Sequence, residues 1–267
     1  MKPLSPRFLS PLAFLSLFVG AVLFGQTGED DADPARVAGA VSYYRGSGGG
    51  NVGIQSGADG VLVVDDKFDG TTEEVAAAIH QVAGSGPDFL INTHHHGDHT
   101  GGNGFFGKAA TIFAQENVRK RLEEEGHTDL LPTVTYRDGV TLHYNGEEVR
   151  VIHFEHGHTD GDSVVWFTGS KVIHMGDLYF QVGYPFVDTA AGGSVQGLIA
   201  AVDRVLEMLP EGTRVIPGHG VAGGIEGLRE YRHMLQTVLE RVSVMHGEGF
   251  GVDEMVEAGV TEDFDDR

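Results

Sequence analysis

Short apolar runs separated by turns dominate the pattern of hydrophobic and polar positions along the chain. Runs such as 41–44 and 61–64 have the length of strands and are rich in the aromatic and β-branched residues that strands favour. The run 61–64 follows 51–55 across the turn 57–60, which predicts a hairpin. By the same criteria we expect further strands over 89–93, 111–114, 140–144, 148–154, 164–168, 171–174 and 214–216.

Other segments place their apolar residues at helical spacing. The segment 73–82 does so with Val75, Ala78, Ile79 and Val82. We expect further helices over 116–125, 195–208 and 225–245. Strands outnumber helices, and helices separate groups of strands. Two sheets packed face to face, with helices outside, would bury both sets of apolar faces, so we predict a single α/β (α+β) domain.

The two ends of the chain differ from its middle. Lys2 and Arg7 precede a mostly apolar stretch, 8–24, which is typical of an export signal. This stretch is short for a spanning helix, although an uncleaved anchor is the alternative. Export predicts a periplasmic or secreted protein with no membrane span after signal removal. The expected organisation is a signal peptide at 1–25, a polar linker at 26–35, a catalytic domain at 36–247 and a solvated acidic tail at 248–267.

Composition narrows the chemistry. The formal net charge of −21 argues against nucleic acid or anionic lipid as partners. The expected partner is a small-molecule substrate. The chain has no cysteine, which excludes disulfides, thiolate ligands and a cysteine nucleophile. Its 14 histidines therefore become the main candidates for metal binding.

The densest group of candidate ligands directly follows the predicted strand 89–93. His94, His96, Asp98 and His99 lie within six residues. Alternate side chains of an extended loop point to the same side, so His94 and His96 can chelate one ion while Asp98 and His99 reach a second. Imidazole and carboxylate are the ligands that Zn²⁺ takes when thiolate is absent. His95 lies on the opposite side of this alternation and is interpreted as structural.

Three later motifs, each beside a predicted strand, offer further ligands. His158, within Gly157-His158-Thr159, would give the first ion a third imidazole. Asp177 follows an apolar strand and can bridge both ions through its two oxygens. His219, within Pro217-Gly218-His219-Gly220, can bind the second ion. Each of these residues alone is as well explained by a turn, but together with the first motif they predict a two-metal site.

In this order, the four motifs resemble those of the metallo-β-lactamase superfamily. The resemblance runs from about residue 40 to residue 245 and implies a four-layer αββα sandwich with the metals at one edge of the two sheets. It implies two Zn²⁺ ions per chain, the first held by His94, His96 and His158, and the second by Asp98, His99 and His219, with Asp177 bridging them.

This ligand set predicts a hydrolase. Two cations roughly 3.5–4 Å apart can hold a bridging hydroxide, which would attack the carbonyl carbon of a cyclic amide or ester of the β-lactam or lactone type. We expect Asp98 or Asp177 to relay the proton. Tyr179 or Tyr184, just after the bridging ligand, can donate a hydrogen bond to the carbonyl oxygen, as a tyrosine does in the lactonases. The catalytic candidates are Asp98, Asp177 and Tyr184.

The substrate stays open between branches of the superfamily. Zinc β-lactamases with a cysteine ligand carry a lysine three residues after it, where this chain has Phe180, which counts against efficient lactam capture. The run 94–103 looks more like that of glyoxalase II, a thioester hydrolase, although the C-terminal region lacks the basic residues expected to hold glutathione. A non-hydrolytic di-iron oxidoreductase or metal-binding accessory protein is the other alternative, because iron uses the same ligands. The glycine run 46–50 is interpreted as a mobile flap over the site.

Overall fold

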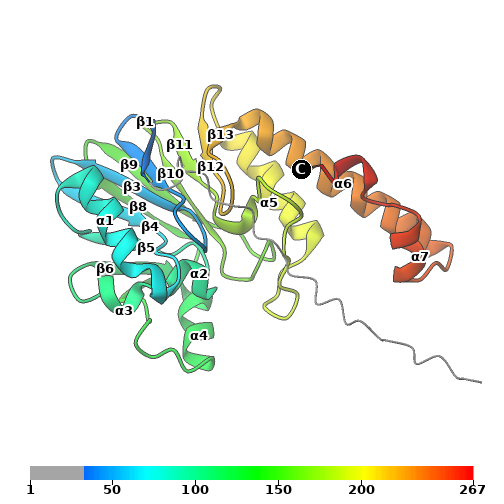
Figure 1. The fold of residues 1–267 in the computed structure, drawn as a ribbon, viewed down its shortest axis with the longest axis horizontal. Helices are drawn as coiled ribbons and strands as arrows, with labels where there is room; N and C mark the ends of the chain where they lie inside the picture. The colour runs from blue at the N-terminus through cyan, green and yellow to red at the C-terminus, as the bar shows by residue number, and fades with distance from the viewer. Residues whose placement is uncertain (1–32, 267) are drawn as a thin grey trace, which may run out of the picture.

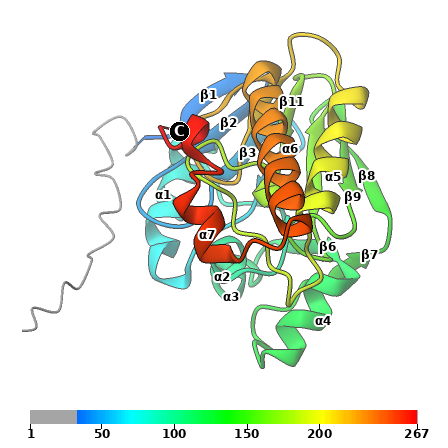
Figure 2. The same cartoon turned by 90° about the vertical axis from the view of Figure 1, so that its right-hand side faces the viewer.

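The computed structural model describes residues 33–266, so the signal-peptide prediction and most of the predicted linker lie outside the described residues. Two β-sheets pack face to face, with helices on their outer faces (Figures 1 and 2). This arrangement is the predicted four-layer αββα sandwich. No helix within residues 33–266 is both long and apolar enough to cross a membrane.

The first sheet has seven strands in chain order. Its first four strands pair antiparallel and its last four pair parallel. The predicted hairpin is confirmed, since Gly57 pairs with Gly60. The strands are β1 (Ala35–Ala38), β2 (Val41–Tyr44), β3 (Val52–Gly57), β4 (Gly60–Val64), β5 (Phe89–Ile91), β6 (Thr111–Gln115) and β7 (Val134–Tyr136).

The second sheet has six strands. Only β11 and β12 pair parallel, and its other neighbours pair antiparallel. Its order is β13 (Gly223–Gly224), β12 (Arg214–Ile216), β11 (Val172–His174), β10 (Ser163–Phe167), β9 (Glu147–His153) and β8 (Gly139–Tyr144). The strands β1, β7 and β13 were not predicted.

Helices cover the outer faces. The α-helices are α1 (Thr72–Ala83), α2 (Gly97–Thr100), α3 (Asn103–Phe106), α4 (Glu116–Glu124), α5 (Val195–Met208), α6 (Ile225–Gly247) and α7 (Val252–Glu257). Three 3₁₀ turns, η2 (Asp69–Thr71), η3 (Gly176–Leu178) and η4 (Glu262–Phe264), complete the described elements. The four predicted helices correspond to α1, α4, α5 and α6.

Successive side chains of the central strands point to opposite faces of the sheet, so each strand contributes to two cores. In β4, Leu62 and Val64 face the core between the sheets, while Val61 and Val63 face the core beneath α1. In β12, Ile216 belongs to the core between the sheets, and its neighbour Val215 packs in the core beneath α5 and α6. Strands buried on both faces appear in the sequence as continuous apolar runs, which is why these strands were predicted.

The C-terminal segment corrects one prediction. We expected residues 248–267 to be a solvated tail, but the segment forms α7 and η4, with Met255 buried and Phe264 packed against the core beneath α5 and α6.

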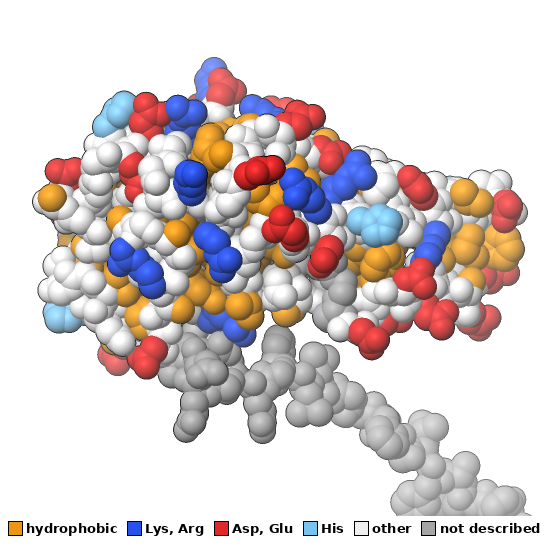
Figure 3. All heavy atoms as spheres, turned by 90° about the horizontal axis from the view of Figure 1, so that it is seen from above, with side chains coloured by type: hydrophobic (Ala, Val, Ile, Leu, Met, Phe, Trp, Pro, Cys, Tyr) orange, Lys and Arg blue, Asp and Glu red, His pale blue; other side chains and the backbone are white. Residues whose placement is uncertain are grey.

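Charged residues elsewhere are mixed in sign. On the face drawn in Figure 3, Lys and Arg side chains are interspersed with Asp and Glu.

Candidate metal centre

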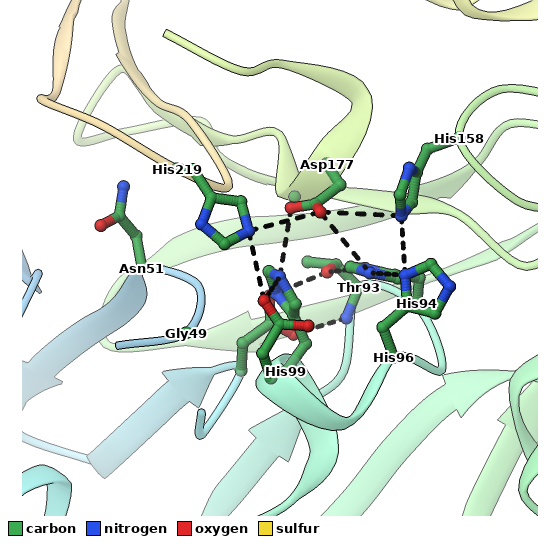
Figure 4. A network of polar contacts seen from close by, with 12 residues as sticks. Gly49, Asn51, Thr93, His94, His96, His99, His158, Asp177 and His219 are labelled. Carbon is green, nitrogen blue, oxygen red and sulfur yellow. Dashed lines mark hydrogen bonds and ion pairs between the residues drawn. The ribbon is translucent and has the colours of Figure 1, made fainter. Parts of the chain in front are cut away.

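The seven predicted ligands meet at one edge of the sandwich (Figure 4). The segment that follows β5 and enters α2 carries His94, His96, Asp98 and His99. His158 lies between β9 and β10. Asp177 lies in η3, directly after β11, and His219 follows β12. Since β11 and β12 are parallel, their carboxyl ends bring Asp177 and His219 to the same edge.

His94, His96 and His158 form the first group of ligand atoms. The Nδ1 atom of His96 lies 3.1 Å from Nε2 of His94 and 2.9 Å from Nε2 of His158. Tetrahedral Zn²⁺ with Zn–N bonds of about 2.0–2.1 Å separates its nitrogen ligands by roughly 3.4 Å. The three imidazoles therefore need only small shifts to hold one ion.

Asp98, His99 and His219 form the second group. Asp98 Oδ2 lies 3.5 Å from His99 Nε2 and 3.3 Å from His219 Nε2. These three ligand atoms lie close enough together to hold a metal ion. The two groups are thus the same two sets that the resemblance implied.

Asp177 lies between the two groups. Its Oδ1 is 3.1 Å from His99 Nε2, and its Oδ2 is 3.4 Å from His219 Nε2. The same Oδ2 is 3.6 Å from His158 Nε2 and 3.9 Å from His94 Nε2. One carboxylate therefore reaches both groups, as expected of a bridging ligand.

Two buried atoms at the centre test whether the site fits a cation. Among the described residues, His99 Nε2 and Asp177 Oδ1 are buried and have no hydrogen-bond partner, although they lie only 3.1 Å apart. Buried polar atoms without a partner are rare in folded proteins because each is costly. A divalent cation would satisfy both atoms, so the donor set fits a metal.

The outer nitrogens of the imidazoles are held by fixed partners. His158 Nδ1 donates to the carbonyl oxygen of Phe186 at 2.8 Å. His96 Nε2 lies 3.0 Å from Asp188 Oδ2, and His99 Nδ1 lies 2.8 Å from Asp65 Oδ2. Such partners fix the ring orientation and leave the opposite nitrogen free to bind a metal. Asp65 and Asp188 were not predicted in this role.

Asp65 also orients His94. The Thr93 hydroxyl donates to Asp65 Oδ2 at 2.8 Å and lies 3.0 Å from His94 Nδ1, so its oxygen can accept the proton of that nitrogen. Asp65 Oδ1 accepts the backbone N–H of Thr93 at 2.7 Å. One buried carboxylate thereby supports a ligand in each group.

The protonation states of the ligand side chains depend on one another. Burial and the neighbouring His99 charge hold the pKa of His94 well below its usual range. Burial alone would lower the pKa of His99, but Asp177 and Asp98 outweigh it and hold that pKa well above its usual range. Burial likewise opposes the charged form of His219, yet hydrogen bonds to Asp177 and Asp98 raise its pKa to about 9. Protons on His99 and His219 therefore compete with a metal for this half of the site.

The glycine run Gly46–Gly50 lies against the second group. The Gly50 N–H donates to the carbonyl oxygen of Asp98 at 3.0 Å. Lys67 is fully buried and donates from Nζ to the carbonyl oxygen of Gly48 at 2.7 Å. Burial lowers the pKa of Lys67 to about 8. The predicted flap is thus tied at one end to the metal-binding loop and at the middle to a buried ammonium.

Lys67→Met is expected to loosen this run. The methionine keeps the buried apolar stem but removes the donor to the carbonyl of Gly48, an exposed residue, so the loss is that of one hydrogen bond, about 0.5–1.5 kcal/mol. We expect faster amide hydrogen exchange at Gly49 and Gly50, measured by mass spectrometry of peptides. Lys108→Met, at an exposed lysine, is the control. Equal exchange in both variants would contradict the tethering role.

Tyr179 and Tyr184, the tyrosines predicted as candidate donors to the substrate carbonyl, both contact other parts of the chain. The Tyr184 hydroxyl donates to Asp265 Oδ1 at 2.6 Å, so it engages the C-terminal segment. Tyr179 is buried and packs against Tyr231, with ring centroids 5.1 Å apart. The structure therefore gives no support to Tyr184 as a donor to the substrate carbonyl. His95 lies outside the two groups of ligands, buried as expected.

The chain is similar to several known proteins over much of its length. The family model described as "Metallo-beta-lactamase superfamily" matches residues 45–219. The "Metallo-beta-lactamase type 2" of Bacteroides fragilis is 23% identical over 155 residues, which cover 58% of this chain and 61% of that protein. A hydroxyacylglutathione hydrolase of Rhodospirillum rubrum is 33% identical over 132 residues, covering 49% of this chain and 47% of that protein. The chain therefore spans less than two thirds of the length of these relatives.

A solved structure shares the fold. The metallo-beta-lactamase from Pontibacter korlensis superposes with a TM-score of 0.66 at 21% sequence identity, covering 76% of this chain and 98% of that chain. A likeness at this identity shows the architecture alone. The reaction must therefore be argued from the residues of the site.

Proposed function

The chain belongs to the metallo-beta-lactamase superfamily, and on that premise we propose that it is a dinuclear zinc hydrolase that opens a cyclic amide or ester. One observation carries the proposal. Two groups of three ligand atoms lie on either side of Asp177, whose oxygens are within 4 Å of an imidazole nitrogen of each group. A single-metal site would not need a carboxylate placed between two such groups.

The residues of the site would bind the metal ions, and one of them would also accept a proton. His94, His96 and His158 would hold one ion, and Asp98, His99 and His219 the other, with Asp177 shared. Zinc bound there would supply Lewis-acid activation of water and of a carbonyl oxygen near neutral pH. Asp98 is the carboxylate that can receive the proton of the attacking water, because its side chain is 21% exposed while that of Asp177 is 4% exposed. Asp177 instead fixes the distance between the two groups.

Thioester hydrolysis is the second candidate. Hydroxyacylglutathione hydrolases are among the relatives that match about half of this chain, with identities of 27–33%. A lactam bearing a carboxylate is less well served, since Phe180 stacks on His219 where the cysteine-ligand branch has a lysine. The ring centroids are 5.0 Å apart and the planes differ by 20°.

Metal analysis and a substrate panel test the proposal. The purified protein should bind two zinc ions per chain. It should hydrolyse at least one of a chromogenic cephalosporin, a carbapenem and an acyl lactone. Turnover of a thioester alone would replace the proposal with the second candidate. Stoichiometric iron with redox activity, and no hydrolysis, would overturn both.

We also propose that the protein is exported to the periplasm or beyond, on the pattern of Lys2, Arg7 and the apolar stretch 8–24. Mass spectrometry of the protein recovered from the periplasm of a bacterial host would test this. A mature form that lacks about the first 25 residues supports cleavage. Recovery of the whole chain from the cytoplasm would contradict it.

A further inference from the structure

Two phenylalanine rings border the ligand cluster. The Phe186 ring centroid lies 6.0 Å from those of both His96 and His158. The Phe180 ring stacks on His219 and lies 6.1 Å from His158. Together these two side chains, which we call the aromatic shelf, contact imidazoles of both groups.

Phe186 is 61% exposed, more than any other phenylalanine among the described residues. Exposing an aromatic ring forgoes the free energy that its burial would give, and large exposed apolar surfaces often mark binding sites. The ring stays exposed although the adjacent Pro185 and Val187 are partly buried. Val187 packs against the core beneath α5 and α6, and with Pro185 it lines an apolar groove of about 230 Å³ beside α6.

The backbone at Phe186 and directly after it is held by the site itself. The Phe186 carbonyl oxygen accepts from His158 Nδ1, and the Asp188 N–H donates to the His158 carbonyl oxygen at 2.9 Å. The Asp188 carboxylate in turn contacts His96 at 3.0 Å. The ring is therefore presented at a defined place relative to two ligands, which reduces the entropy lost when a ligand packs against it.

We propose that the aromatic shelf binds an apolar acyl or aryl group of the substrate, next to the bond that is hydrolysed. This inference rests on the proposed function and names the substrate class of the same site. Such a group would cover the exposed Phe186 ring and gain about fourfold in affinity for each methylene that it buries. Phe180 and Phe186 are then the residues that determine specificity.

The test compares an apolar and a small carboxylate as ligands of the zinc-loaded protein. Titration calorimetry with phenylacetate and with acetate measures binding without turnover. The protein should bind phenylacetate about tenfold or more tightly than acetate, because the phenyl ring adds several buried carbons. Phe186→Ala should remove most of this preference and leave acetate affinity near its original value. The matched control is Phe250→Ala, at a phenylalanine that is 41% exposed in the turn between α6 and α7.

The outcomes separate the two proposals. If Phe186→Ala still prefers phenylacetate, the proposal that the aromatic shelf binds an apolar group is wrong. Equal binding of the two acids by the unaltered protein would contradict it as well. Hydrolysis of the substrate panel together with either result would leave the proposed function standing. Loss of preference in Phe186→Ala, with no hydrolysis of any substrate, would instead support the shelf and count against the hydrolase. Circular dichroism should show both variants folded, since neither truncated ring is buried.

Discussion

Asp177→Ala is expected to abolish hydrolysis and to lower the zinc content below two ions per chain. The side chain is buried, and its oxygens lie within 4 Å of four imidazoles, those of His94, His99, His158 and His219. Removing it leaves the imidazolium groups of His99 and His219, whose pKa values are raised, without their shared counter-charge, which typically costs about 3–5 kcal/mol for a buried pair. We expect activity to fall by on the order of 10³-fold or more, because both halves of the site lose a group that stabilises charge.

Two further variants sharpen this prediction. Asp177→Asn keeps the shape but loses the negative charge, so it should retain more metal than Asp177→Ala while remaining nearly inactive. Asp203→Ala removes an aspartate that pairs with Arg232 on the outer helices and should leave metal content and turnover unchanged. Metal content is measured by atomic emission after dialysis, and turnover on whichever substrate the panel identifies. Full activity in Asp177→Ala would contradict the role of Asp177 as a carboxylate shared by the two metal ions.

The metal-binding loops could be predicted because their ligands sit next to strong strand patterns. The apolar residues of β5, β11 and β12 mark where each strand ends, and the ligands follow at or near those ends. Strand ends of parallel neighbours converge, so local pattern was enough to bring the side chains together. The motif order then implied which residues share an ion.

The supporting carboxylates could not be assigned in the same way. Asp65 directly follows β4, just as Asp177 follows β11 within a few residues, so the same kind of evidence was present in the sequence. Its role depends on the register that places Val64 beside Ile91, which carries Asp65 to Thr93 and His99. That pairing joins segments distant in sequence. Asp188 lies in an irregular stretch with no periodicity to interpret.

The short strands and the C-terminal segment were missed for a compositional reason. β13 is two glycines, and β7 is three residues long with two of them exposed, so neither shows an apolar run. In the C-terminal segment the acidic residues mask a single buried anchor, Met255. A few apolar contacts decide the conformation there, and charge composition does not reveal them.

Gly50→Ala tests whether the close packing of Gly50 against His99 is needed for metal binding by the second group of ligands. A Cβ atom at Gly50 would lie 2.1 Å from Cε1 and 2.5 Å from Nε2 of His99. His99 has no room to retreat, because it is fully buried and Asp65 holds its Nδ1 from the other side at 2.8 Å. Either the imidazole or the glycine run must move. We expect the affinity of the second metal to fall about 10–100-fold, as when a supporting contact is lost, and turnover to fall at least as much.

Gly70→Ala is the matched control, because a Cβ at Gly70 meets nothing within 4 Å and its backbone is not in the left-handed region. Competition with a chelator measures the two metal affinities separately. The first group lies beyond the clash, so its affinity should change little, and the variant should bind one ion tightly and one weakly. Equal weakening of both ions would indicate general unfolding, which circular dichroism would reveal. Unchanged affinity for both ions would show that Gly50 does not press on His99 in solution, and the glycine run would then be a flap that stands away from the metals.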